Sequence, residues 1–293
     1  MIDRVIRWWR DPWGQPRLLQ LFVWAYIAWS LLPVVIAVQF GFNEGRSRSV
    51  WQGLSLRWYF TDPELSVWND ASLMAALTQS LKLAGLTMMV ATPLGVALAL
   101  GLARWRGRGS KPANFLLLLP MATPELVMGV ALFMVFIYLF PFIELGTSAQ
   151  LIGHVTFTIS YVVIVVRGRL FAIGRDYEEA AMDLGATPAQ AVRMILLPLM
   201  APAIFASLMI AFAVSIDDFV ISAFLSGGAE SATIPVRLYS SARMAPTPAL
   251  NALASVLLFL TLLAVAGAAL VMRRSRDRSG ARGSAVEEFA RLS

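Results

Sequence analysis

Three carboxylates interrupt stretches of the sequence that are otherwise apolar. Glu125 lies in one such stretch, and Asp217 and Asp218 stand next to each other in another. A carboxylate inside a membrane-spanning segment is costly and usually faces a cavity or a substrate path. No basic residue within a span could neutralise these groups, unless Lys82 or Arg237 reaches in from the outer ends. We therefore predict an acidic lining for a cationic substrate or a water-filled path, with helix capping or pairing to loop arginines as the alternative role.

The sequence offers little material for other chemistry. It has no cysteine and a single histidine, His154, which leaves no thiolate metal site and makes most hydrolytic chemistry hard to build. We expect no catalytic residue and no metal ligand. Because no partner inside the membrane lies near His154 in the sequence, we interpret it as a hydrogen-bonded residue at the start of a helix and not as a proton relay.

The composition places the chain in a membrane. Hydrophobic residues make up 58% of the 293 residues and charged residues only 14%, with a mean hydropathy of +0.69. A soluble domain is about 45–50% apolar and about 25% charged, so this chain has too few charges to coat a soluble surface. The net charge of +6 does not indicate nucleic-acid binding, because the arginines flank the apolar runs and form no single patch.

Six apolar runs are long enough to cross a bilayer, whose hydrocarbon core requires about 20 residues of helix. The predicted fold class is therefore an all-α membrane protein with six transmembrane helices. The runs cover Leu18–Phe42, Leu83–Ala103, Ala113–Ile143, Leu151–Val166, Leu199–Leu225 and Ala249–Met272.

Basic residues predict the orientation of these spans. Of the 24 lysines and arginines, 18 lie before the first run, between the second and third, between the fourth and fifth, or after the sixth, and six lie on the other side. Since cytoplasmic loops are enriched in lysine and arginine, both termini are expected in the cytoplasm. The expected organisation is a cytoplasmic segment at 1–17, a membrane domain at 18–272 and a basic cytoplasmic tail at 273–293.

The cytoplasmic segment at 173–198 has the signals of two short helices joined by an elbow. Asp176 is predicted to cap the first helix, and Gly185 to end it in a left-handed conformation. Thr187, with Gln190 three residues later, is typical of a capping box that begins the second helix. A face of alanines on the first helix would let the backbone of another protein approach closely. The alternative is a solvated connector between two spans.

This segment resembles the EAA loop of importer-type ABC permeases at every position of that motif. In such permeases the loop forms coupling helices that dock into a groove on the ATPase subunit, and the resemblance implies the same role and a type I ABC importer permease fold here. The matching residues are Glu179, Ala180, Ala181, Gly185, Ile195, Leu197 and Pro198. The sequence contains no Gly-x-x-x-x-Gly-Lys-Ser/Thr phosphate loop, so ATP hydrolysis is assigned to a separate subunit.

A second resemblance covers nearly the whole chain and is to the second permease subunit of spermidine/putrescine importers, closest to the putrescine branch. It implies a bacterial inner-membrane complex of two different permeases, an ATPase dimer that holds ATP and Mg, and a periplasmic polyamine-binding protein. The matching stretches are Ser215-Ile-Asp-Asp-Phe-Val-Ile-Ser222, Ser226-Gly-Gly228, Thr233-Ile-Pro-Val-Arg237, Asn251-Ala-Leu-Ala254, His154-Val-Thr-Phe157 and Pro124-Glu125.

Two other classes of function stay open at this point. The same machine could carry another solute, such as an amino acid, an inorganic anion or thiamine, although the intramembrane carboxylates argue against an anion. The chain could also be an autonomous carrier, a channel or an intramembrane enzyme. That class leaves the EAA segment unexplained, and a lone histidine without a nucleophile motif offers no reaction.

Overall fold

The computed structural model describes residues 17–47, 50–105, 107–244 and 248–292. Within these ranges the chain is helical, and its strand-like pairing is limited to one isolated bridge between Asn43 and Leu54. The α-helices are α2 (Arg17–Gly41), α3 (Ala71–Arg104), α4 (Ser110–Ala122), α5 (Glu125–Met134), α6 (Thr147–Ile173), α7 (Asp176–Asp183), α8 (Pro188–Ala191), α9 (Leu197–Asp217), α10 (Val220–Phe224), α11 (Ile234–Met244) and α12 (Pro248–Leu292). Short π and 3-10 segments are η1 (Arg57–Thr61), η2 (Val135–Leu139), η3 (Val192–Leu196) and η4 (Ala229–Ser231).

Among the described residues, five helical stretches are long and apolar enough to cross a membrane by themselves. They include α2, α3, α6, the run from α8 through α9, and the first part of α12. The predicted third span is not one continuous helix, because α4 and the helix from α5 through η2 meet at an angle of 105°. Counting this bent pair as one span gives the six that the composition predicts.

The break in the third span follows from a proline. Thr123 precedes Pro124, and the proline ring disfavours helical backbone at the residue before it. Thr123 accordingly has extended backbone, with φ −79° and ψ 132°. The predicted fifth span is also interrupted, because α9 ends at Asp217 and Asp218 is extended, with φ −66° and ψ 121°, before the short α10 begins.

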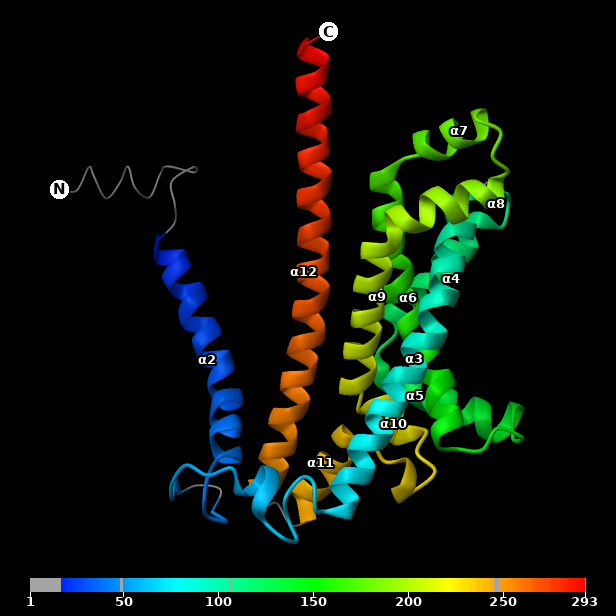
Figure 1. Cartoon of the computed structure of the whole chain (residues 1–293). Helices are drawn as coiled ribbons and strands as arrows, with labels where there is room; N and C mark the ends of the chain where they lie inside the picture. Colours follow the sequence, from blue (N-terminus) through cyan, green and yellow to red (C-terminus); the bar gives the residue numbers. More distant parts are fainter. Residues whose placement is uncertain (1–16, 48–49, 106, 245–247, 293) are drawn as a thin grey trace, which may run out of the picture.

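The centre of the bundle is formed by α3, α6 and α9, which pack against one another (Figure 1). Small residues allow the close approach of α3 and α6: a Cβ atom on Gly95 would lie 2.5 Å from Cγ1 of Val162, and Ala91 and Ala99 are fully buried on α3. Close packing of small residues is a usual way to associate membrane helices. One of the three buried hydrophobic clusters lies here, between α3, α6 and α9.

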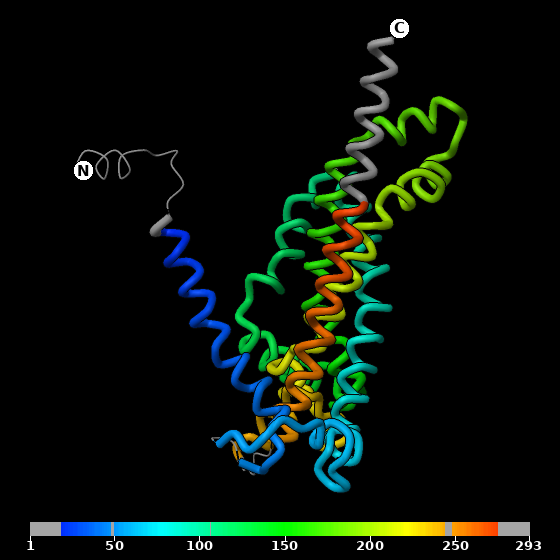
Figure 2. Tube along the Cα trace, turned by 60° about the vertical axis from the view of Figure 1, so that its left-hand side comes forward, coloured from blue at the N-terminus to red at the C-terminus, as the bar shows by residue number. Residues whose placement is uncertain are grey.

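The remaining spans are arranged on one flank. α12 packs on α9, and α2 packs on α12 while leaning away from the other helices in both views (Figures 1 and 2). α7 and α8 lie at the same end of the bundle as the start of α2 and the far end of α12 (Figure 1). The 42–70 loop and α11 lie at the opposite end. The helix α12 continues to Leu292, so the basic tail extends the last span as helix.

Candidate transport pathway and coupling segment

The first helix of the coupling segment begins differently from the prediction. Arg175 occupies the N-cap of α7 without a side-chain cap bond, and Asp176 is the first helical residue and not the cap. Asp176, Glu178 and Glu179 all lie in the first turn. Negative side chains at this position complement the partial positive charge of a helix N-terminus. The acidic residues therefore do mark the start of α7, but they favour it through the helix dipole and not through a cap hydrogen bond.

The elbow and the second helix agree with the prediction. Gly185 has φ +91°, a left-handed conformation that glycine adopts without steric cost. The N–H of Gly185 donates to the carbonyl of Met182 at 2.9 Å, and the N–H of Ala186 donates to that of Ala181 at 3.0 Å. Thr187 and Gln190 form a complete capping box on α8, with Pro188 in the first turn.

This segment presents a largely exposed surface at one end of the molecule. No residue of α7 is buried. Glu179, Ala180, Gly185 and Pro198 are exposed, and the apolar side chain of Leu184 beside them is 90% exposed. The other predicted contact residues are half-buried: Ala181 on α7, Ile195 in η3 and Leu197 at the start of α9.

One ion pair connects the coupling segment to the helix bundle. Arg104, the last residue of α3, pairs with Glu178 of α7, and both side chains are at most about one-third exposed. The two residues line a small pocket together with Arg175. α7 therefore has a direct electrostatic contact with a membrane-spanning helix.

The second candidate site is the break between α9 and α10. The carboxylate of Asp218 accepts hydrogen bonds from the backbone N–H of Ser222 at 2.8 Å and of Ile221 at 3.4 Å. Its neighbour Asp217 is exposed in the single chain and has no hydrogen-bond or ion-pair partner among the described residues. The two adjacent carboxylates thus lie in different surroundings.

Glu125 is the first residue of α5 and is exposed. α5 packs closely on α10, since a Cβ atom on Gly129 would lie 2.8 Å from Cδ2 of Phe224. Glu125 thus begins the helix that packs on α10, the helix that follows Asp218, although no hydrogen bond links the carboxylates themselves. Neither Lys82 nor Arg237 forms an ion pair with them in the described part of the chain.

The sequence interpretation of His154 was incomplete. The imidazole is buried within α6, with Nε2 3.2 Å from Oδ2 of Asp218 and 3.0 Å from Oγ of Ser222, and Nδ1 2.7 Å from Oγ of Ser215. These partners lie 61 to 68 residues away in the chain, so no local pattern could reveal them. His154 is hydrogen-bonded, as predicted, but it lies two turns inside α6 and its partners come from distant parts of the chain.

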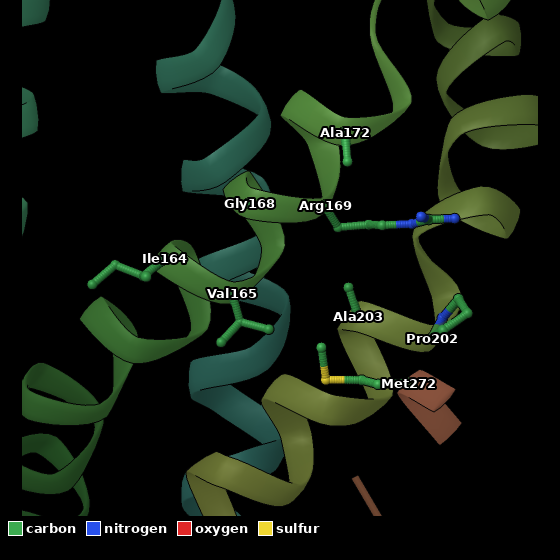
Figure 3. A pocket seen from close by; sticks show the side chains of 8 residues that line it. All are labelled: Ile164, Val165, Gly168, Arg169, Ala172, Pro202, Ala203 and Met272. Atoms are coloured by element: carbon green, nitrogen blue, oxygen red, sulfur yellow. The ribbon is translucent and has the colours of Figure 1, made fainter. Parts of the chain in front are cut away.

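A pocket that contains none of the candidate carboxylates lies between α6, α9 and α12 (Figure 3). Its walls are mainly apolar, and Arg169 is its charged member, donating from Nε to the carbonyl of Leu199 at 3.3 Å. None of the three candidate carboxylates lines it. This pocket is therefore separate from the acidic candidate site.

Comparison with known proteins identifies the family. Residues 91–277 match the family described as binding-protein-dependent transport system inner membrane component. This match contains both the coupling segment and the break between α9 and α10. The chain belongs to this family. It is accordingly a multi-pass protein of the bacterial inner membrane and a transport permease rather than an enzyme.

Relatives in Escherichia coli (strain K12) extend over most of the chain. The putrescine transport system permease protein PotI is 36% identical over 254 residues, which are 85% of this chain and 86% of PotI. The spermidine/putrescine transport system permease protein PotC is 34% identical over 252 residues, covering 86% of this chain and 92% of PotC. The resemblance to polyamine importer permeases that the motifs indicate is confirmed.

Solved structures support the fold. A bacterial ABC transporter involved in the import of the acidic polysaccharide alginate aligns with a TM-score of 0.66 and 18% identity, over 94% of this chain and 98% of that one. An amino acid ABC transporter aligns with a TM-score of 0.54 and 22% identity, over 71% and 96% of the two chains. The helices thus have the arrangement of an ABC importer permease.

Proposed function

We propose that this chain is one of two different permease subunits of an ATP-driven type I importer that carries polyamines into the cytoplasm. The observation that carries the proposal is the 36% and 34% identity to permeases of putrescine and spermidine/putrescine systems over most of the chain. The anionic cargo of the alginate transporter does not transfer, because that likeness, at 18% identity, concerns the fold.

The chemistry of the candidate pathway supports a cationic substrate. Asp217 and Glu125 are exposed carboxylates, and neither has a basic partner among the described residues. In a lining of low dielectric constant a fixed carboxylate attracts an ammonium group and offsets part of the cost of removing its water. Release requires that such binding be weak, so tight selection belongs to a soluble binding protein.

The coupling segment supports dependence on a separate ATPase. α7 and α8 present an exposed surface with an apolar residue, Leu184, at its tip, and the residues of the EAA motif lie on or beside it. The sequence has no phosphate loop. In this proposal ATP and Mg are bound by an ATPase dimer, and α7 and α8 dock on it.

The unpartnered face of α2 supports a second permease. The most apolar 18-residue window of α2 has no buried residue, and the helix leans away from the rest of the bundle (Figures 1 and 2). A homologous subunit packed against α2 would cover this surface, with lipid covering the rest. The outer end of the assembled pair, formed here by the 42–70 loop and α11, would receive the periplasmic polyamine-binding protein.

The proposal is tested with the assembled complex in proteoliposomes. We expect putrescine or spermidine, presented by its binding protein, to stimulate ATP hydrolysis severalfold and to accumulate inside the vesicles. Histidine and molybdate, each presented by its own binding protein, serve as controls. Stimulation by one of these controls in place of polyamines would replace the substrate assignment and keep the importer assignment. Uptake without any ATPase subunit would contradict the importer assignment itself.

A further inference from the structure

The adjacent residues Asp217 and Asp218 differ in their burial and in their contacts. The Asp218 side chain is 6% exposed and is surrounded by three donors: the N–H groups of Ser222 and Ile221 and the imidazole of His154. Asp217 is exposed and has no partner in the described residues. A cation that approached Asp218 would have to compete with contacts that are already made.

The imidazole that faces Asp218 is itself fixed from the other side. Nδ1 of His154 lies 2.7 Å from Oγ of Ser215 on α9, and that hydroxyl lies 3.3 Å from Oγ1 of Thr87 on α3. Because a carboxylate only accepts, Nε2 carries a proton and donates to Asp218, while the Ser215 hydroxyl that contacts Nδ1 donates onward to Oγ1 of Thr87. This assignment follows from the hydrogen-bond network.

A second chain of hydrogen bonds lies one turn away on α6. The amide of Gln150 donates to the carbonyl oxygens of Ser222 and Ser231, each at 2.9 Å, and its Oε1 accepts from Gln79 of α3 at 3.0 Å. Gln150 and Gln79 are both buried. α10 and the segment that follows it are thus tied to α6 and α3 by buried polar contacts.

From this geometry we infer that the two carboxylates have different functions. Asp218, held by His154, fixes the break at which α9 ends and α10 begins, and Asp217 is left facing the path of the cation. His154 is a positioning residue that acts through Asp218. This assignment rests on the proposed polyamine function only for Asp217, because the role of the His154–Asp218 pair is a statement about the fold.

The physical reason for the pairing is the cost of an irregular backbone inside a membrane. Where a helix breaks, N–H groups lose their helical partners, and in hydrocarbon they must find others. The Asp218 carboxylate accepts from two such groups at the start of α10, and the imidazole stabilises its charge. Removal of one partner of a buried pair leaves the other uncompensated, whereas removal of both takes away the buried charge and leaves only the N–H groups of Ser222 and Ile221 without their acceptor.

The first test compares three variants of the full complex: Asp217→Asn, Asp218→Asn and His154→Gln. We expect Asp217→Asn to keep the thermal midpoint and ATP hydrolysis of the wild type but to import at least tenfold less polyamine per ATP hydrolysed. Asp218→Asn and His154→Gln should lower the thermal midpoint by several degrees. The complexes that still assemble should import as much polyamine per ATP hydrolysed as the wild type. A wild-type midpoint with a low ratio for Asp218→Asn would overturn the assignment.

A double variant keeps the test decisive if a single variant fails to assemble. His154→Leu leaves the Asp218 charge unpaired, while His154→Leu with Asp218→Leu removes both polar groups. We expect the double variant to be closer to the wild type in thermal midpoint than the sum of its two single variants predicts. Additive losses would overturn the pairing.

A third measurement does not depend on any substrate. The chain has no cysteine, so Ser222→Cys and Asp217→Cys each introduce the single thiol of this subunit. A cationic methanethiosulfonate reagent should modify Cys at 217 at least tenfold faster than Cys at 222, and His154→Leu should speed the reaction at 222. Equal rates at the two positions would contradict the role of the His154–Asp218 pair in fixing the break between α9 and α10, even in a complex that transports another solute.

Discussion

At the scale of single residues, the buried carboxylate of Asp218 combines two local backbone donors with an imidazole from a distant part of the sequence. The contact could not be read from the sequence, because a lone histidine in an apolar run gives no sign of partners on α9 and α10. The acidic candidates could be predicted from the sequence because a carboxylate in an apolar run is unusual in itself. The sequence could not predict which of these acidic residues is buried, because the helix end between Asp217 and Asp218 is defined only by tertiary packing.

Asp62, in the loop between α2 and α3, is a buried carboxylate outside the membrane whose donors lie within five residues of it in the chain. Burial acts to raise its pKa, but hydrogen bonds from the N–H groups of Leu65 and Glu64 and from Arg57 outweigh it and hold the pKa below the ordinary value of 3.8. The carboxylate is therefore stabilising above that value, and the stabilisation is lost as the pH falls through the lowered pKa of the folded state.

For Asp62→Ala we expect a loss of about 1–3 kcal/mol at pH 7, because the donors that face it lose their acceptor. Asp62→Asn should also remove the part of the acid sensitivity that sets in below about pH 4. The thermal midpoint of the purified complex as a function of pH measures both effects. Glu64→Gln, at an exposed neighbour, is the control and should change neither. Wild-type acid sensitivity in Asp62→Asn would contradict this role.

At the scale of elements, most signals that are local in the sequence led to correct predictions, the cap at Asp176 being an exception, and those that depend on packing did not. The capping box of Thr187 and the left-handed Gly185 are properties of four to six consecutive residues, and both are present as predicted. The predicted spans Leu83–Ala103 and Leu151–Val166 are shorter than α3 and α6. The reason is that a helix continues past charged residues such as Lys82 and Arg167. The bend at Thr123 could have been anticipated from Pro124, but its 105° angle could not.

Gly185→Asp tests the coupling segment as an element. A side chain at φ +91° is strained by about 1–2 kcal/mol, and its Cβ atom would meet nothing of this chain within 4 Å. A large effect must therefore come from a docked partner. We expect normal membrane insertion, loss of transport, and weakened or uncoupled ATPase association, measured by co-purification and by polyamine-stimulated ATP hydrolysis.

The matched control is Gly185→Asn, since asparagine tolerates the left-handed conformation and carries no charge. It should retain a substantial part of the transport that Gly185→Asp loses. Wild-type transport by a normally expressed Gly185→Asp complex would count against the docking assignment.

The ion pair between Arg104 and Glu178 predicts how motion of α7 reaches the membrane helices. Arg104→Glu and Glu178→Arg should each lower the amount of polyamine imported per ATP hydrolysed. The double charge exchange should recover most of it, with a coupling energy of about 1 kcal/mol or less, because the pair is partly exposed. A double variant no better than its singles would show that the pair is not part of the connection.

At the scale of the whole molecule, the arrangement of charges and the arrangement of helices agree. The start of α2, the end of α12 and the coupling helices α7 and α8 lie at one end of the bundle (Figure 1). The sequence assigns all of these segments to the side with 18 of the 24 basic residues. The basic residues predict which compartment this end faces. The fold shows that these segments share one end of the bundle, which a hydropathy profile with a broken third span leaves ambiguous.

Single cysteines at Asp183 and Glu64 test this arrangement, because both positions are exposed and the chain has no cysteine of its own. Asp183 lies at the end of α7 and Glu64 in the 42–70 loop, at opposite ends of the bundle. In intact cells a membrane-impermeant maleimide should label Cys at 64 at once and Cys at 183 only after the membrane is opened. The reverse pattern would place α7 outside the cell, where no ATP is available. It would therefore refute the orientation and the coupling role together, although the helix arrangement would stay the same.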